Sequence, residues 1–310
     1  MMYEYWLGKI RGISGAKKRK LREYYGDARN IYYIEESRLK KDALLGEKEL
    51  DILCEARKQD GVEEDYRKLM MAGIRFLPWF DGDYPRRLLK VPSPPYALYG
   101  KGRLPEDDRP SVAIVGARKC TPYGEQAALE FGEALARAGV QVVSGLARGI
   151  DGAAQRGALN GGGAVFGVLG CGVDVCYPRE HIGLYTDIQK TGGLLSEYPP
   201  GTPPLPAHFP VRNRIISGLA DQVLVMEARE KSGSLITADM ALEQGRDVYA
   251  LPGPFSSSLS RGCHQLIRQG AGILVSPEEF LWEIGQGKCL LRQKSDKNEK
   301  ILESHENMLY

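Results

Sequence analysis

The sequence lacks the features that mark membrane, secreted and disulfide-rich proteins. No run of about 18 consecutive apolar residues occurs, so we expect no membrane-spanning helix. The first residues include Glu4 and Lys9, which is not the pattern of a secretory signal peptide. The six cysteines are scattered without a C-x-x-C pair, so we expect reduced, mostly buried thiols in a cytoplasmic protein.

The sequence also lacks a strong net charge and the common motifs of nucleotide-dependent and hydrolytic enzymes. It has 42 lysines and arginines against 40 aspartates and glutamates, so nucleic-acid binding would need a local basic patch. No G-x-x-x-x-G-K-[ST], G-x-S-x-G or H-E-x-x-H motif occurs, and no G-x-G-x-x-G follows the first buried strand. With only four histidines and no carboxylate pair in a strand-end motif, we expect no metal, no cofactor and no catalytic centre.

The chain divides into an N-terminal helical part and a longer part in which strands alternate with helices. Residues 3–72 show no strand pattern, and a turn at Gly12–Gly15 precedes the basic run Lys17–Lys20. This arrangement resembles a helix-hairpin-helix or SAM-like module, which often contacts nucleic-acid backbones. The basic run would serve equally well as a solvated helix face. We expect a helical module over residues 1–72, an α/β domain over 73–287 and a polar C-terminal tail over 288–310.

The α/β part begins with a strand at Ile74–Pro78 and a proline-rich lead-in, which should pack on the edge of the following domain. Further strands are predicted at Val112–Val115, Val140–Val143, Ala164–Leu169, Gln222–Met226, Asp247–Ala250 and Gly272–Val275, with helices at Tyr123–Ala138, Ile150–Leu159, Pro210–Leu219 and Ser234–Glu243. This alternation predicts a doubly wound, mostly parallel sheet with ligands at the carboxyl ends of its strands.

The segment SVAIVGARKCTPYG, which contains the first of these buried strands, predicts an anion site. Its apolar run ends at Gly116, the basic residue Arg118 follows, and a helix should begin after Thr121 as N-cap with Pro122 in the first position. Unpaired backbone N–H groups and the helix dipole favour a phosphate at such a helix start.

Other polar turns should lie at the same edge of the sheet. Ser144-Gly145 and Ser232–Thr237 are small-residue turns that precede helices. Farther along, Phe209 stands close to Arg212 and Arg214 at the start of a predicted helix. One interpretation is a phosphate clamp beside an aromatic that stacks a base, a contact of roughly 1–3 kcal/mol. The alternative is that one of the arginines forms an internal salt bridge.

The segments GARKCTPYG, SGLARGID, YPRE, FPVRNRIISG, EAREKSGSLITA and GRDVYALPG, in this order and spacing, resemble the DNA-processing protein A (DprA/Smf) family over roughly residues 70–285. The resemblance implies a Rossmann-like domain with an added N-terminal helical module. It also implies a non-enzymatic, cytoplasmic, homodimeric protein that binds single-stranded DNA. Such a protein loads the RecA recombinase and displaces single-strand-binding protein in natural transformation (competence) and DNA recombination.

The family pattern also implies site residues. The expected DNA-binding residues are Gly116, Ala117, Arg118, Thr121, Tyr123, Gly124, Ser144, Gly145, Arg179, Phe209, Arg212, Asn213, Arg214, Ser232, Gly233, Ser234 and Thr237. Gly116 and Arg118 would grip a phosphate, and Phe209 would contact a base. The expected dimer or partner surface contains His264, Leu266, Ile267 and Ile273. The alternative for Leu266 and Ile267 is that they belong to the core.

Two alternative functions are a nucleotide-processing enzyme, which would use the same strand-end turns, and a scaffold protein, which would not need them. A nucleotide-processing enzyme would bind a nucleoside monophosphate there and would need a general acid or base, for which Asp151 and Glu227 are the candidates. A scaffold that binds only RecA would show no affinity for single strands. Release of a free base would indicate the enzyme, and a strand-binding assay would expose the scaffold.

Overall fold

The N-terminal part of the chain is a cluster of short helices. The structure is a computed structural model and describes residues 1–59 and 61–287. The first six helices are α1 (Met2–Lys9), α2 (Gly15–Tyr25), α3 (Ala28–Tyr33), α4 (Glu36–Asp42), α5 (Glu47–Arg57) and α6 (Val62–Met71). Ser14 and Asp27 begin α2 and α3 as N-caps, because their side chains accept the backbone N–H groups of Lys17 and Asn30.

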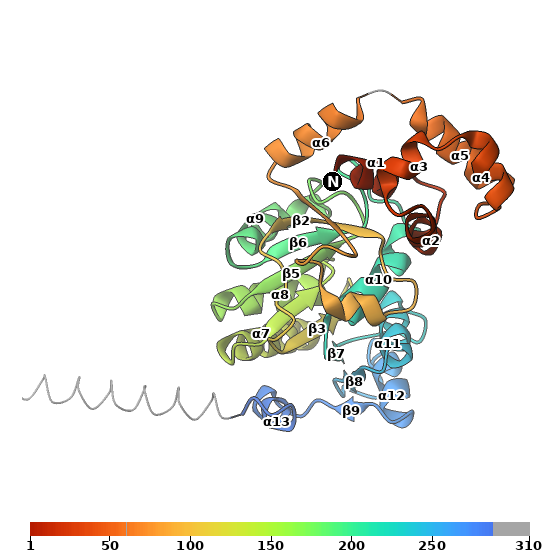
Figure 1. Cartoon of the computed structure of the whole chain (residues 1–310). Coiled ribbons are helices and arrows are strands. Elements are labelled where there is room, and N and C mark those ends of the chain that lie inside the picture. The colour runs from red at the N-terminus through yellow and green to blue at the C-terminus, as the bar shows by residue number, and fades with distance from the viewer. Residues whose placement is uncertain (60, 288–310) are drawn as a thin grey trace, which may run out of the picture.

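The helical cluster shares its core with the first strands of the sheet. Trp6 and Leu53 are fully buried, and Phe76, Tyr96 and Tyr99 from the following segment belong to the same hydrophobic cluster. Figure 1 shows these helices together at the end of the sheet that carries β2. The division at residue 72 into separate domains stays a prediction, and the predicted tail at 288–310 lies outside the described residues.

The described strands form one sheet in the order β1-β2-β6-β5-β4-β3-β7-β8-β9. Their bounds are β1 (Arg75–Pro78), β2 (Ala97–Gly102), β3 (Ser111–Val115), β4 (Gln141–Ser144), β5 (Val165–Leu169), β6 (Gly193–Ser196), β7 (Gln222–Val225), β8 (Asp247–Ala250) and β9 (Gly272–Ile273). The pairs β1–β2 and β2–β6 are antiparallel and all other pairs are parallel. The predicted α/β class with a mostly parallel sheet is confirmed, and the lead-in does form the sheet edge.

Helices cover both faces of the sheet (Figure 1). They are α7 (Pro122–Arg137), α8 (Ile150–Asn160), α9 (Ile182–Thr191), α10 (His208–Leu219), α11 (Gly233–Glu243), α12 (Arg261–Arg268) and α13 (Pro277–Glu283), with 3-10 turns η1 (Arg86–Lys90) and η2 (Arg179–His181). Val112 and Ile114 of β3 pack with α7, α8, α9 and α13, whereas Ala113 and Val115 pack with η1, α10, α11 and α12. This alternation is the two-residue period of a strand buried on both sides.

Glycines allow α7 and α8 to pack unusually close. A Cβ atom on Gly132 of α7 would lie 2.2 Å from the carbonyl oxygen of Ala154, and one on Gly157 of α8 would lie 2.0 Å from that of Leu129. The contact fixes both helices that follow the strand-end turns of β3 and β4.

None of the helices in residues 1–59 and 61–287 is long and apolar enough to cross a bilayer.

Candidate nucleic-acid interface

A pocket of about 390 Å³ lies at the carboxyl ends of the central parallel strands. Its wall is formed by the turn after β3, the start of α8, the segment before η2, the start of α10 and the start of α11. The predicted residues in the wall are Gly116, Ala117, Arg118, Phe209, Arg212, Asn213, Ser232, Gly233, Ser234 and Thr237. The structure therefore brings together most of the predicted DNA-binding set, from three separate stretches of the chain.

Arg118 carries the available positive charge of this pocket. Its side chain is exposed, and its guanidinium lies 5.2 Å from the centre of the half-buried Phe209 ring. Within the described ranges no carboxylate forms an ion pair with Arg118. An arginine held against an aromatic face keeps its hydrogen-bond donors free and its position restricted, which suits a phosphate contact.

The start of α7 differs from the prediction. Thr121 is the N-cap as expected, but its backbone N–H and its hydroxyl both donate to the carboxylate of Glu227, at 2.8 and 2.6 Å. Gly124 is buried against the same carboxylate, since a Cβ atom there would lie 2.5 Å from Glu227 Cδ. An internal anion already occupies the positive end of this helix. The expectation of an exposed anion-binding helix start at α7 is therefore wrong. Thr121 and Gly124 pack against Glu227 and do not line the pocket.

The start of α8 is also filled by a carboxylate. Asp151 is buried and accepts the backbone N–H of Gly145 at 3.0 Å. Burial raises the pKa of Asp151, and the nearby Arg212 opposes this shift. Ser144 is buried and donates to the carbonyl oxygen of Ile114 at 2.6 Å. Ser144 and Gly145 therefore support the pocket without lining it, contrary to their predicted role.

Arg212 is a structural arginine in the wall of the pocket. Only 4% of its surface is exposed, and it donates to the carbonyl oxygens of Gly145, at 2.9 Å, and Val168. Burial lowers the pKa of Arg212 to about 10. Its Nη1 is therefore engaged with the ends of β4 and β5, and its Nε donates to the Asn213 side chain at 3.2 Å. Arg212 still lines the pocket, so the predicted phosphate clamp stays a prediction for this residue.

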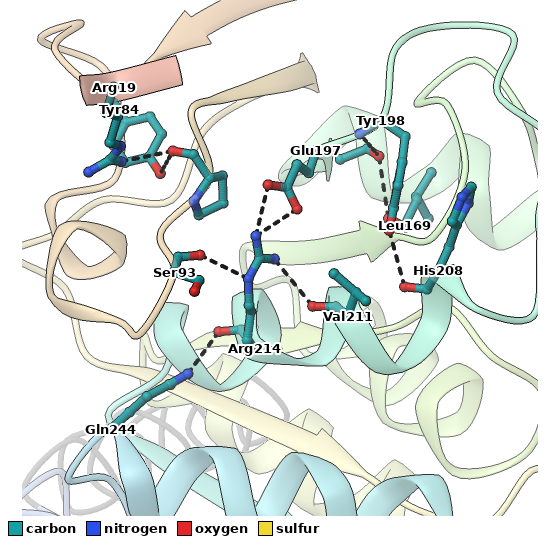
Figure 2. Close-up of polar contacts among 12 residues, drawn as sticks. Arg19, Tyr84, Ser93, Leu169, Glu197, Tyr198, His208, Val211, Arg214 and Gln244 are labelled. Carbon is teal, nitrogen blue, oxygen red and sulfur yellow. Dashed lines mark hydrogen bonds and ion pairs between the residues drawn. The ribbon is translucent and has the colours of Figure 1, made fainter. Parts of the chain in front are cut away.

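Arg214 lies outside the pocket and confirms the alternative interpretation for this residue. Its Nη2 donates to both carboxylate oxygens of Glu197, at 2.8 and 2.7 Å (Figure 2). The salt bridge is largely shielded, with 13% of the Arg214 side chain exposed. For Arg214 the structure thus favours the internal salt bridge over the predicted phosphate clamp.

The start of α11 is a helix N-terminus that faces the pocket without a carboxylate in its first turn. Ser232 caps it by accepting the backbone N–H of Ser234 at 3.2 Å. Asn213 donates to the carbonyl oxygen of Gly233 at 3.2 Å, which ties α10 to this turn. The positive end of the α11 dipole and Arg118 therefore belong to one pocket, an arrangement that favours an anion between them.

A family model described as DNA recombination-mediator protein A matches residues 75–285, well over half of the chain. The chain belongs to this family. Protein Smf of Escherichia coli is 49% identical over 199 residues, which cover 64% of this chain and 53% of that relative's length. DNA processing protein DprA of Streptococcus pneumoniae is 45% identical over 203 residues, covering 66% of this chain and 72% of that relative.

Solved structures of family members agree with the fold. DNA processing protein A from Streptococcus pneumoniae superposes with a TM-score of 0.79 at 35% identity, covering 91% of this chain and 98% of that one. The Helicobacter pylori protein, described together with its single-stranded DNA binding mode, gives a TM-score of 0.61 at 29% identity, with coverages of 68% and 95%. The Rossmann-like domain and the helical N-terminal region expected for the family are both present.

Two further predicted DNA contacts lie away from the pocket, and the pocket wall contains an aromatic residue that was not predicted to contact DNA. Tyr123 is exposed and donates to the carbonyl oxygen of Pro252 at 2.9 Å. Arg179 is exposed on η2, outside the pocket wall. Tyr177, two residues earlier, does line the pocket, and its ring centre lies 5.6 Å from that of Phe209. An aromatic residue beside the strand-end turn was the sequence signal for it.

The predicted dimer or partner surface is only partly exposed. Leu266 is 3% exposed in the core, and Ile267 packs against that core, so the core alternative holds for Leu266. His264 is half-buried, with Nε2 3.0 Å from the carbonyl oxygen of Gly253. Ile273 is exposed on the edge strand β9. Homodimerisation stays a prediction.

Three of the four side chains in the basic run of α2 have partners within the protein. Lys17 forms an ion pair with Glu49 at 2.5 Å. Lys18 is buried and donates to two backbone carbonyls of the α1 end. Arg19 donates to the carbonyl oxygen of Pro95 at 2.8 Å. Lys20, the last residue of the run, is exposed.

The two candidate acids or bases both have hydrogen-bond partners within the protein. Asp151 and Glu227, the candidate acids or bases, accept hydrogen bonds from the protein's own backbone and hydroxyl groups. In residues 1–59 and 61–287, no cluster of three or more His, Cys, Asp or Glu side chains could hold a metal ion. Of the cysteines in these ranges, Cys171 and Cys263 are buried and the other three are half-buried free thiols, while Cys289 lies outside them.

Proposed function

We propose that this protein binds single-stranded DNA in the pocket at the ends of β3 and β7. The observation that carries the proposal is a combination of three features of the described residues: an exposed Arg118 without an ion-pair partner among them, a half-buried Phe209 beneath it, and the start of α11, which has no carboxylate in its first turn. Phosphate would lie between Arg118 and the α11 turn, and a base would stack on Phe209. The single-stranded DNA binding named for the Helicobacter pylori relative supports the choice of ligand.

The size of the pocket favours a nucleotide of a single strand over a duplex. Its volume of about 390 Å³ is at the lower end of the roughly 300–1,000 Å³ found for small-ligand pockets. A base can reach such a pocket only when it is unstacked, as it is in a single strand. The contacts involve the aromatic face and the phosphate rather than base edges, so we expect little sequence preference.

The wider role that we propose follows from the family. The protein would act without catalysis in the cytoplasm, as a homodimer that hands single strands to RecA in place of single-strand-binding protein during DNA uptake and recombination. A direct test adds the protein to single strands coated with single-strand-binding protein and follows RecA filament formation. We expect faster filament formation, and an unchanged rate would contradict the loading role.

Strand binding is tested with a fluorescent 20-nucleotide oligothymidine in an anisotropy titration at moderate salt. Arg118→Ala should weaken binding about tenfold, corresponding to about 1.4 kcal/mol. Arg156→Ala is the matched control, because this arginine pairs with Asp187 away from the pocket. Equal affinities of wild type and Arg118→Ala would contradict the assigned pocket. Release of free base from a nucleoside monophosphate would instead support a nucleotide-processing enzyme.

A further inference from the structure

The Arg214 side chain connects three segments that are far apart in the sequence. Its Nη2 binds the carboxylate of Glu197, directly after β6, and its Nε donates to the carbonyl oxygen of Ser93 at 3.0 Å. Its Nη1 donates to the carbonyl oxygen of Val211 in α10 at 3.2 Å. Figure 2 shows these three contacts converging on one guanidinium. None of these three side-chain partners lines the pocket.

Glu197 and its neighbour hold α10 at two points. While Glu197 binds Arg214 in the second turn of the helix, the Tyr198 ring stacks on His208 at the helix start, with ring centres 4.0 Å apart. The backbone oxygen of Arg214 also accepts Gln244 Nε2 at 3.1 Å (Figure 2). Phe209 lies between these two points. The position of the proposed base-stacking ring is therefore set from outside the pocket.

The Ser93 contact extends this network to the N-terminal helices. Ser93 has a φ angle of +52°, a left-handed conformation that is uncommon for serine, and its carbonyl oxygen accepts Arg214 Nε. Two residues later, the carbonyl oxygen of Pro95 accepts Arg19 of α2 at 2.8 Å and the Tyr84 hydroxyl at 3.0 Å (Figure 2). Segment 93–95 thus has α2 on one side and α10 on the other.

We propose that the Glu197–Arg214 pair is a positioning pair, which fixes α10 so that Phe209 stays under Arg118 and which joins the helical N-terminal region to the DNA pocket. This inference rests on the proposed function. The pair contacts no DNA and carries no catalytic or phosphate-binding role. Its charge is compensated within the protein, whereas the charge of Arg118 is left for the ligand.

The two roles open to Arg214 predict opposite effects of neutralising its partner. If Arg214 gripped phosphate, Glu197→Gln would remove a competing carboxylate and strengthen DNA binding. If the pair positions α10, the same substitution weakens binding, because an amide cannot accept both charge-assisted hydrogen bonds. Arg214→Lys separates the roles as well, since lysine keeps the charge but cannot reach Glu197, Ser93 and Val211 with one planar group.

The experiment compares Glu197→Gln and Arg214→Lys of the full chain with wild type. The matched controls are Asp187→Asn and Arg156→Lys, which alter an ion pair on α8 and α9. Affinity for the 20-nucleotide oligothymidine is measured by anisotropy, and hydrogen exchange of residues 208–219 is measured without DNA. We expect three- to tenfold weaker binding by both test variants, faster exchange in α10, and no change in the controls.

Unchanged or tighter binding by Glu197→Gln, with unchanged exchange in α10, would overturn the positioning role. Wild-type affinity of Arg214→Lys together with weakened Glu197→Gln would also overturn it, because both must act on the same helix. A wild-type protein without affinity for oligothymidine would overturn the proposed function itself. That outcome can be told from the others because it is measured on the wild-type protein alone.

Discussion

Among the arginine–phenylalanine contacts of the described residues, the pairs Arg22–Phe80 and Arg118–Phe209 have opposite surroundings. In the N-terminal region the Arg22 guanidinium lies 3.7 Å from the centre of the Phe80 ring, and its Nε donates to the buried Glu4 at 2.9 Å. In the pocket Arg118 lies over Phe209 without a carboxylate partner in the described part of the chain. The same side-chain chemistry serves packing in one region and leaves charge for a ligand in the other.

The comparison shows that the density of basic residues does not locate a binding site. The run Lys17–Lys20 is the most basic stretch of the helical region, yet three of its four side chains are held by protein groups. The pocket has one exposed arginine, but a helix start and an aromatic ring accompany it. Partners decide whether a charge is available, and partners are set by the fold.

The largest expected effect comes from removing the aromatic member of each pair. Phe209→Ala should weaken oligothymidine binding by roughly 1–3 kcal/mol, since a stacked base contributes about that much. Phe80→Ala, the matched variant, should leave binding unchanged although it loosens the packing of Arg22. Anisotropy titrations of folded variants measure both, and equal losses would break the distinction between the two pairs.

The second prediction concerns the buried Lys18. Burial lowers its pKa to about 7, partly opposed by the nearby Glu197. Between this value and the ordinary value near 10.5 the unfolded chain holds a proton that the folded protein lacks, so stability should rise with pH across that window. The rise approaches about 1.4 kcal/mol per pH unit.

Urea unfolding of wild type and Lys18→Met at several pH values from about 7 to 10 measures this rise. The variant should show a flatter dependence, because it has no proton to lose in that window. Lys17→Met is the control, since this exposed lysine should leave the dependence as in wild type. Parallel curves for wild type and Lys18→Met would contradict a neutral, internal Lys18.

A smaller effect is expected at Tyr177, which sequence reasoning missed. Tyr177→Leu should weaken oligothymidine binding about two- to fivefold, below the effect of Phe209→Ala, because Tyr177 supports the Phe209 ring from the rim of the pocket. Tyr123→Leu is a suitable comparison, as this exposed tyrosine lies outside the pocket wall. A larger loss of affinity for Tyr123→Leu would indicate that the DNA runs along α7 instead.

The smallest effect is expected at the Lys17–Glu49 pair. Lys17→Ala should cost about 0.2–1 kcal/mol of stability, the usual range for a solvent-exposed ion pair. Its affinity for oligothymidine should stay within twofold of wild type. Thermal unfolding and anisotropy give the two values, and a tenfold loss of affinity would show that α2 contacts DNA.

The regular features of the fold could be predicted because each has a strong local signal. The apolar run of β3 and the cap and proline that begin α7 are correct to within a residue. Strand β6 was not predicted, because Gly193–Ser196 contains only two apolar residues, Leu194 and Leu195, between a glycine and a serine. Helix α9 was missed as well.

The sequence predicts many of the residues that form the candidate site, but not which of their side chains are free to bind a ligand. Sequence patterns grouped Arg118, Arg212 and Arg214, which share a charge, and the fold separates them by burial and partners. Glu227 was considered only as a catalytic group. It is 106 residues from Thr121 in the sequence, yet its Oε1 lies 2.6 Å from the Thr121 hydroxyl oxygen. Contacts of this kind depend on tertiary packing.

The salt dependence of oligothymidine binding tests most directly where the available charge lies. Each phosphate contact of a single strand contributes about 0.7 to the slope of log K against log salt. We expect Arg118→Ala to reduce the slope by about 0.7, and Lys20→Ala, at the exposed end of the basic run, to leave it unchanged. A reduced slope for Lys20→Ala with a wild-type slope for Arg118→Ala would contradict this expectation.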